Sequence, residues 1–168
     1  MTLHPIEQVL GALNAAGVRY LVVGGVAVVL HGHLRTTADL DLVVSLEAEN
    51  ARRAIDAVTA LGYRPRAPVP AVKFADPAER ASWIADKGLT VFSLWSERAT
   101  GLELDLFVRE PFDFEAAWSR RVTVSLDTTT ATVASLQDLI ALKRAAGRPQ
   151  DDADIEALEA IAGRKGTP

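Results

Sequence analysis

Apolar residues follow two different periods along this chain, which predicts a mixture of helices and strands. Ile6, Val9, Leu10 and Leu13 recur at helical spacing, and Gly17 lies where a helix of that phase would end. Strands are predicted where apolar residues form short continuous runs or alternate with polar ones. These segments are 19–23, 38–45, 89–96, 102–108, 121–127 and 128–134.

Capping residues and breakers predict the remaining helices. Asp76 followed by Pro77 marks a helix start, and Ser135 with Asp138 resembles a capping box that opens the run SLQDLIALKRAAG. The prolines of the segment 64–70 predict a loop with no regular structure. Further helices are predicted after the double glycine at 24–25, over 46–61, around 114–118 and over 151–163.

Together these elements predict an α/β (α+β) fold in which a small mixed β-sheet is flanked by helices. The strands over 89–96 and 102–108 are close enough in sequence to form a hairpin. We expect residues 1–134 to form the main domain and residues 135–168 to form a helical segment packed on it, as a single compact unit.

Composition and charge narrow the possible classes of protein. Hydrophobic residues make up 49% of the chain and charged residues 24%, an ordinary globular balance. There is no cysteine, so disulfides and thiolate metal sites are excluded, and a cytoplasmic location is expected. No apolar run reaches the roughly 20 residues that span a bilayer, so we expect no membrane association. The net charge of −4 argues against a broad electrostatic surface for nucleic acid.

Two acidic residues interrupt the apolar strand predicted over 38–45. Successive side chains of a strand point to opposite faces, so Asp39 and Asp41 share one face while Leu40 and Leu42 share the other. Alternation toward solvent is one explanation. The other is a metal site, because two carboxylates this close repel each other and a divalent cation relieves the repulsion. Oxygen ligands favour Mg²⁺ or Mn²⁺.

The predicted strand over 102–108 repeats this pattern, with leucines alternating with Glu103 and Asp105. If this strand lies beside the first, Glu103 or Asp105 completes a three-carboxylate cluster. Periodicity cannot separate the two acids, because they share one face. Such a cluster can hold two metal ions about 3.5–4 Å apart and support phosphoryl transfer.

Gly24 and Gly25 follow a predicted strand and precede a predicted helix. Glycines in that position allow a phosphate to approach the backbone, although a double glycine is often only a turn. The chain contains neither G-x-G-x-x-G at a suitable place nor G-x-x-x-x-G-K-[ST], so we expect neither a Rossmann enzyme nor a P-loop NTPase. The order of the glycines, the Asp-x-Asp pair and the second acidic strand favours one shared site over three unrelated features.

Other polar residues have alternative explanations. His31 and His33 have no third histidine or cysteine nearby, so we expect a polar helix end or a pocket wall and not a metal site. Lys143 and Arg148 either form a basic helix terminus or neutralise phosphate. The last predicted helix opens with acids that suit its dipole, namely Asp151, Asp152 and Asp154.

The run from Tyr20 to Val44 resembles the signature of the polymerase-β-like nucleotidyltransferase superfamily: an apolar residue, Gly-Gly, roughly ten further residues and Asp-x-Asp between apolar positions. The segment LELDLFV resembles the third-carboxylate strand of that superfamily. The tail LIALKRAAGRPQDDADIEAL is similar to the ending of small bacterial nucleotidyltransferases of the abortive-infection (AbiEii-type) toxin group.

This resemblance implies a role for each residue of the acidic and glycine motifs. Gly24 and Gly25 would contact the triphosphate of an NTP. Asp39 and Asp41 would bind the metal ions. Asp105 would join one metal and act as, or near, the general base for the acceptor hydroxyl. Many relatives carry a serine at the position of Gly25, but Gly-Gly also occurs in the superfamily.

The resemblance also implies that Lys143, and with it Arg148 and Arg35, neutralises phosphate charge. Residues 1–134 would then be the catalytic domain of a metal-dependent nucleotidyltransferase. Toxins of this kind act on tRNA or protein and can have an antitoxin partner, and we rank such an acceptor narrowly first. The alternatives are an enzyme that modifies an aminoglycoside-type antibiotic, which the acidic pI favours, and a non-catalytic nucleotide-binding regulatory or interaction module.

Overall fold

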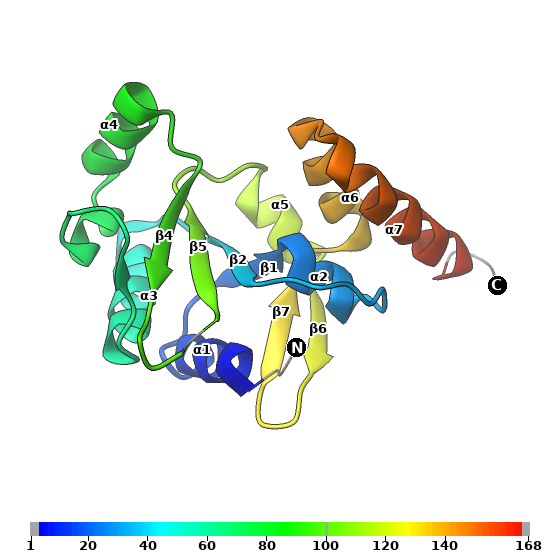
Figure 1. Cartoon of the computed structure of the whole chain (residues 1–168), viewed down its shortest axis with the longest axis horizontal. Coiled ribbons are helices and arrows are strands. Elements are labelled where there is room, and N and C mark those ends of the chain that lie inside the picture. Colours follow the sequence, from blue (N-terminus) through cyan, green and yellow to red (C-terminus); the bar gives the residue numbers. More distant parts are fainter. Residues whose placement is uncertain (1–3, 100, 166–168) are drawn as a thin grey trace.

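A mixed β-sheet forms the centre of the computed structural model, which describes residues 4–99 and 101–165. Within these residues the sheet has seven strands in the order β3-β4-β5-β2-β1-β7-β6 (Figure 1). Strand β2 pairs in parallel with β5, and β1 pairs in parallel with β7, whereas the other pairs are antiparallel. The strands are β1 (Tyr20–Val23), β2 (Asp39–Val44), β3 (Arg64–Pro65), β4 (Val91–Trp95), β5 (Glu103–Phe107), β6 (Val122–Ser125) and β7 (Thr130–Val133).

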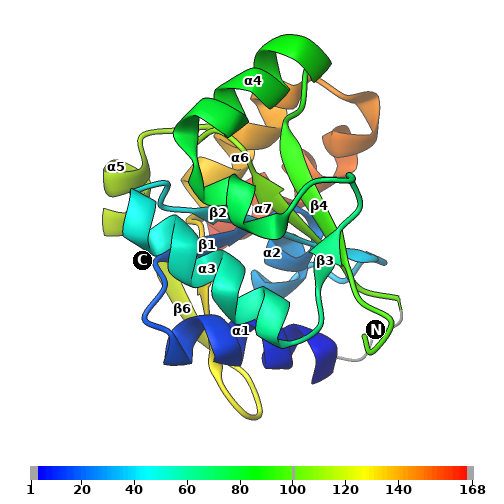
Figure 2. The same cartoon turned by 90° about the vertical axis from the view of Figure 1, so that its left-hand side faces the viewer.

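Helices flank both faces of the sheet, which confirms the predicted fold class. Figure 2 shows α1, α3 and α4 in front of the sheet and the C-terminal pair α6 and α7 behind it. The α-helices are α1 (His4–Ala15), α2 (Gly24–Leu30), α3 (Ala48–Ala60), α4 (Pro77–Lys87), α5 (Phe114–Ser119), α6 (Leu136–Ala146) and α7 (Asp152–Lys165). Two short 3₁₀ helices, η1 (Ala71–Ala75) and η2 (Pro149–Asp151), connect them.

The strand sequences explain where the core lies. Strand β1 is buried along its whole length, as expected for a continuous apolar run in a central strand. In β2 and β5 the leucines are buried and the intervening residues are only half-buried, so one sheet face packs into the core and the other carries the acids. The leucines on the core side are at most 1% exposed: Leu40, Leu42, Leu104 and Leu106.

Capping residues begin the helices where the sequence predicts. The Asp76 carboxylate accepts a hydrogen bond from the backbone of Ala78, with Pro77 as the first residue of α4. The Ser135 hydroxyl accepts a hydrogen bond from the backbone of Asp138 at the start of α6. The hairpin of β4 and β5 is also confirmed, although Thr100 in its connection lies outside the described residues.

One predicted loop is partly wrong. Arg64 and Pro65 form the short strand β3, which adds an edge to β4. Proline is tolerated there because an edge strand has one side without a hydrogen-bonding neighbour. The prolines that follow conceal this pairing, since they are typical of a loop. No helix in the described part of the chain has the length and hydrophobicity needed to cross a membrane.

Candidate active site

Parallel pairing of β2 and β5 places acidic residues of the two strands side by side. Asp41 lies opposite Asp105, and Asp39 lies opposite Glu103. On the other side of β5, the antiparallel strand β4 places Ser93 opposite Asp105. The Ser93 hydroxyl donates a 2.6 Å hydrogen bond to Oδ1 of Asp105. The three strands therefore build one polar surface from residues that are far apart in sequence.

A cavity of about 880 Å³ lies between this surface and the C-terminal helices. It contains every residue that the sequence singles out for a nucleotide site. These are the acids Asp39, Asp41 and Asp105, here called the acidic face, the glycines Gly24 and Gly25, and the cations Arg35, Lys143 and Arg148, here called the cationic wall. The fold thus brings together residues spread from position 24 to position 148, so that acidic and basic side chains line the same cavity.

Both glycines are closely packed against other side chains at the N-terminus of α2. Gly24 has a φ of +69°, and a Cβ at this position would lie 2.8 Å from the Cγ atom of Asp41. A Cβ on Gly25 would lie 2.8 Å from the Thr37 hydroxyl and 3.4 Å from the guanidinium carbon of Arg35. Real Cβ atoms almost never lie less than 3.0 Å from another heavy atom, so the two 2.8 Å distances show that the double glycine allows Asp41 and Thr37 to approach the backbone at the turn.

No lysine or arginine in the described part of the chain forms an ion pair with Asp39, Asp41 or Asp105. Burial, together with the charges of Asp105 and Asp39, raises the pKa of Asp41 to about 7, although Lys143 and Arg148 oppose this rise. Burial and the neighbouring carboxylates also raise the pKa of Asp39. The carboxylates therefore repel each other at neutral pH, as expected for like charges on adjacent strands.

The structure separates Asp105 from Glu103, which periodicity left equivalent. Asp105 lines the cavity, whereas Glu103 does not. Glu103 instead forms an ion pair with Arg66, which extends from the segment after β3. Asp105 is therefore the acid of β5 that faces the same space as Asp39 and Asp41.

In the cationic wall, in contrast, each cation is paired with a buried acid, and three cations share two carboxylates. Lys143 is only 8% exposed and lies 3.0 Å from Asp154 Oδ2 and 3.5 Å from Asp151 Oδ1. Arg148 donates to both oxygens of Asp151, at 2.9 and 3.2 Å. Arg35 forms an ion pair with Asp154 and so connects the segment before β2 to α7. Burial alone would raise the pKa of Asp151, but its hydrogen bond from Arg148 and the charge of Lys143 together lower it.

The interpretation of Asp151 and Asp154 as helix-dipole charges is incomplete, because both also pair with cations of the cationic wall. Both are buried and paired, whereas Asp152 is exposed. A signal was present in the sequence. Asp154, Leu158 and Ile161 follow the spacing of one helical face, and all three are buried.

The sequence did not predict the roles of two polar residues near the acidic face, Thr37 and Ser93. Thr37 lines the cavity beside Gly25 and donates a hydrogen bond to the carbonyl of Asp39. Ser93 contacts Asp105 but lies in the apolar run VFSLW, where it resembles an ordinary outward-facing residue. Its contact depends on the register of β4 against β5, which periodicity does not provide.

The donor set of the acidic face fits a hard divalent cation, because it consists only of carboxylate oxygens that repel one another. Within residues 4–99 and 101–165, no three acidic or histidine side chains are already grouped closely enough to surround one ion. His31 is not part of this site: its ring is buried and its Nε2 is 2.8 Å from the carbonyl oxygen of Ala134.

Residues 3–163 match a protein family described as "nucleotidyltransferase of unknown function (DUF6036)". The chain belongs to this family. It is therefore a nucleotidyltransferase, in agreement with the superfamily expected from the glycine and aspartate motifs. No curated protein matches the chain.

Solved structures of nucleotidyltransferases share the fold. The lincomycin-bound lincosamide antibiotic adenylyltransferase LnuA aligns with a TM-score of 0.64 at 16% identity, over 96% of this chain and 98% of that one. ANT(2")-Ia in complex with adenylyl-2"-tobramycin aligns with a TM-score of 0.61 at 17% sequence identity, over 98% of this chain and 89% of that chain. An antigenic nucleotidyltransferase-like protein from Paracoccidioides brasiliensis aligns with a TM-score of 0.59 at 19% sequence identity, over 95% of this chain and 74% of that chain.

Proposed function

We propose that this nucleotidyltransferase transfers a nucleoside monophosphate from an NTP to an acceptor hydroxyl, using Mg²⁺ or Mn²⁺ held by Asp39, Asp41 and Asp105. One observation carries the proposal: three carboxylates that form no ion pair within the described residues, three cations and the double glycine all line a single cavity. A triphosphate with bound metal ions has the charge pattern that such a cavity complements.

The triphosphate lies between the double glycine and the cationic wall. At the turn after β1, the absence of side chains on Gly24 and Gly25 lets phosphate oxygens approach the backbone. Lys143, Arg35 and Arg148 neutralise the phosphate charge. Since Asp151 and Asp154 hold these cations in place before the nucleotide arrives, little ordering remains to be done when it binds.

The reaction is an in-line displacement at the α-phosphorus. The acceptor oxygen forms a bond to phosphorus, the bond from the α-phosphorus to the bridging oxygen breaks, and pyrophosphate leaves. Asp105 receives the acceptor proton or orients the hydroxyl, with Oδ1 held by Ser93. A bound divalent metal supplies Lewis-acid stabilisation of the transferring phosphoryl group.

We further propose residues 1–134 as the catalytic domain and residues 135–168 as the helical segment that completes it. The ion pairs of Lys143 and Arg35 support this division, because the first residue lies on α6 and the second on the catalytic domain, and both contact Asp154 of α7. For the acceptor we rank tRNA or protein narrowly first, with an antitoxin as a possible partner chain, on the basis of the toxin-like tail.

An antibiotic of the aminoglycoside or lincosamide class is the second candidate acceptor. The fold shared with LnuA and ANT(2")-Ia and the net charge of −4 favour a cationic small molecule. The two candidates share the donor site and differ only in what approaches Asp105.

Transfer of label from each α-³²P-NTP tests the proposal. The purified chain is incubated with Mg²⁺ and with total tRNA, lysate protein, lincomycin or tobramycin in separate reactions. We expect one NTP to label one acceptor class, and the Asp39→Asn/Asp41→Asn variant to lose that labelling. Calorimetric titration of each NTP with Mg²⁺ measures donor binding independently of the acceptor.

The matched control is Asp127→Asn, which removes an exposed carboxylate that does not line the cavity. It should retain both binding and transfer. Equal NTP binding by the wild type and the double variant would contradict the assignment of the acidic face. NTP binding that requires the acidic face, but without transfer to any of the four acceptors, would contradict the acceptor ranking and leave the donor site supported.

A further inference from the structure

A second cavity, of about 500 Å³, lies between α4 and the segments that follow β2 and β5. It shares no lining residue with the larger cavity. Its volume is within the range of small-molecule sites. Six of its lining residues are apolar, namely Leu46, Pro77, Ala81, Ile84, Val108 and Phe112. The other three are charged, namely Arg80, Arg109 and Glu110.

Arg80 is a buried cation that has no carboxylate partner among the described residues. The residue is 6% exposed, and burial lowers the pKa of its guanidinium, with Asp76 and Glu110 opposing this only through their charge at a distance. Its Nη1 donates a 2.6 Å hydrogen bond to the carbonyl of Phe74. Buried charges in proteins are normally paired, because an unpaired one loses its hydration without compensation.

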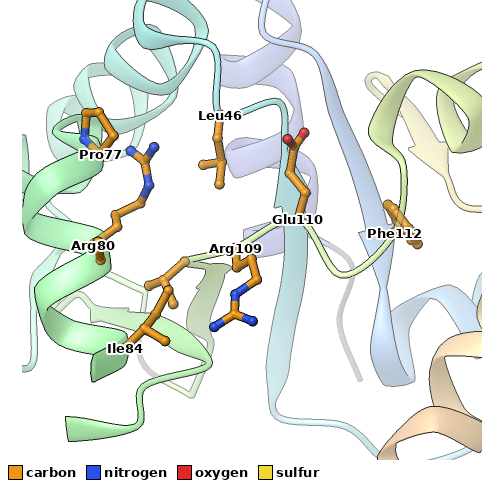
Figure 3. Close-up of a pocket in the computed structure, with 9 residues that line it drawn as sticks. Leu46, Pro77, Arg80, Ile84, Arg109, Glu110 and Phe112 are labelled. Atoms are coloured by element: carbon orange, nitrogen blue, oxygen red, sulfur yellow. The ribbon is translucent and has the colours of Figure 1, made fainter. Parts of the chain in front are cut away.

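Arg80 lines this cavity, and its remaining N–H groups make no hydrogen bond within the described residues. No acceptor in the described residues receives a hydrogen bond from Nε or Nη2. Of the described side-chain atoms that are fully buried, only the Tyr63 hydroxyl lacks a partner, so Nε and Nη2 are accessible. Figure 3 shows the Arg80 side chain extending from α4 toward Leu46.

The opposite side of the cavity adds one cation, Arg109, and one acid, Glu110. Arg109 is exposed and forms no ion pair within the described residues. Burial raises the pKa of the Glu110 carboxyl, although the backbone of Leu46 and the charge of Arg80 oppose this rise. Figure 3 places these two side chains across from Arg80. The charge of the cavity is therefore positive, with the hydrogen-bonding capacity of Arg80 largely unused.

We propose that this cavity is a ligand site for a small molecule that carries one carboxylate or phosphate group on an apolar body. The anionic group binds the free N–H groups of Arg80, since a guanidinium presents paired donors that match both kinds of oxyanion. The apolar body lies against Leu46, Ile84 and Phe112. The binding site is separate from the nucleotide site, and the proposal does not depend on the acceptor or on the reaction.

The ligand site adjoins the larger cavity through a shared segment. Phe107 and Pro111 line the larger cavity, while Arg109 and Glu110 between them line the smaller one. A ligand on Arg80 therefore contacts the same segment that borders the nucleotide site on the side of Asp105.

Amide NMR titration of the full chain with phenyl phosphate, benzoate and neutral benzamide tests the proposal. We expect both anions, or one of them, to shift the amide resonances of α4 and of residues 108–112. Benzamide should bind at least tenfold more weakly than the better anion. The anion that binds more tightly identifies the head group as phosphate or carboxylate.

Two variants on α4 provide matched readouts. Ala81 is exposed and lines the cavity, so Ala81→Glu should weaken anion binding at least fivefold by repulsion. Ala85 is exposed on the same helix but does not line the cavity, so Ala85→Glu should change binding less than twofold. Arg80→Gln should abolish binding, and Ala81→Glu decides the question if that variant does not fold.

Any one of the following results would overturn the proposal. The first is that neither anion shifts these resonances at a ligand concentration of about 20 mM, roughly 20-fold above a millimolar dissociation constant. The second is that benzamide binds as well as the anions. The third is that the shifts are confined to residues around the larger cavity, or that Ala81→Glu and Ala85→Glu weaken binding equally.

Discussion

The acidic face and the cationic wall carry opposite charges across one cavity, and they are stabilised in opposite ways. The acidic face consists of Asp39, Asp41 and Asp105, which are held by strand register and repel one another. The cations of the opposing wall are each paired with a buried carboxylate, Asp151 or Asp154. Among the described residues the acids of the acidic face form no ion pair, whereas each cation of the cationic wall forms at least one.

This difference indicates what each wall contributes before a ligand arrives. The cationic wall is a fixed scaffold, because every buried charge in it has a partner. The acidic face is unfavourable as it stands, and its free energy improves when a proton or a metal cation binds. Substitutions should therefore have opposite effects on stability in the two walls.

The largest effect on stability is expected for Lys143→Met. It removes the cation shared by Asp151 and Asp154 and leaves buried carboxylates undercompensated, so the free energy of unfolding should fall by about 3–5 kcal/mol. Urea unfolding measures the change. Lys87→Met, at an exposed position of α4, should change it by less than about 0.5 kcal/mol. Recovery of stability in Lys143→Met/Asp154→Asn would sharpen the comparison, and a loss no larger than that of Lys87→Met would contradict it.

Asp41→Asn should have the opposite effect and raise the free energy of unfolding. The pKa of Asp41 is raised from 3.8 to about 7, so its ionised form is disfavoured in the folded state. At pH 8 the free energy of unfolding of Asp41→Asn should exceed that of the wild type by up to about 4 kcal/mol. Nucleotide transfer should fall by about 10³-fold, since a metal ligand is lost. Lower stability of Asp41→Asn at pH 8 would show that the acidic face is not strained.

The pH dependence follows from the same shift. A carboxyl with a raised pKa binds a proton more readily in the folded state, so its contribution to stability is greatest at low pH. That contribution is lost as the pH rises from about 4 to about 7. The stability difference between wild type and Asp41→Asn should therefore open across this window and remain constant above it. Urea unfolding of both proteins at half-unit pH steps measures it, and a difference that does not vary with pH would contradict the shift.

Metal binding should give a smaller effect. With 10 mM Mg²⁺ and a millimolar dissociation constant, the wild type should gain about 1–2 kcal/mol of unfolding free energy. The Asp39→Asn/Asp41→Asn variant should gain none, and a chelator should reverse the gain. Equal stabilisation of both proteins would place the metal elsewhere.

Ser93→Ala should have the smallest effect. Loss of the 2.6 Å hydrogen bond to Asp105 should lower the rate of transfer about tenfold and leave stability within about 1 kcal/mol. Ser93→Thr keeps the hydroxyl and should recover most of the rate. Recovery by Thr distinguishes orientation of Asp105 from a general packing defect, which both variants would share.

The two walls also differ in how well the sequence predicts them. The acidic face depends on alternation within strands, and a period of two is visible in DLDL and LELDL. The identities of Asp39, Asp41 and Gly24 as cavity residues follow from such local patterns. The cationic wall depends on which helix face is buried, and the acids at the start of α7 are equally compatible with a solvent-exposed helix end.

The sequence by itself determined the order of helices and strands apart from the short edge strand β3, the placement of Asp39 and Asp41 on one face, and the double glycine at the turn into α2. These are local properties, since backbone periodicity and glycine conformation act over a few residues. Only the tertiary structure decided that Asp105 and not Glu103 faces the cavity, that Ser93 orients it, and that Asp154 joins Arg35 to Lys143. Each of these contacts depends on strand register or helix docking, which is set by the packing of the whole core.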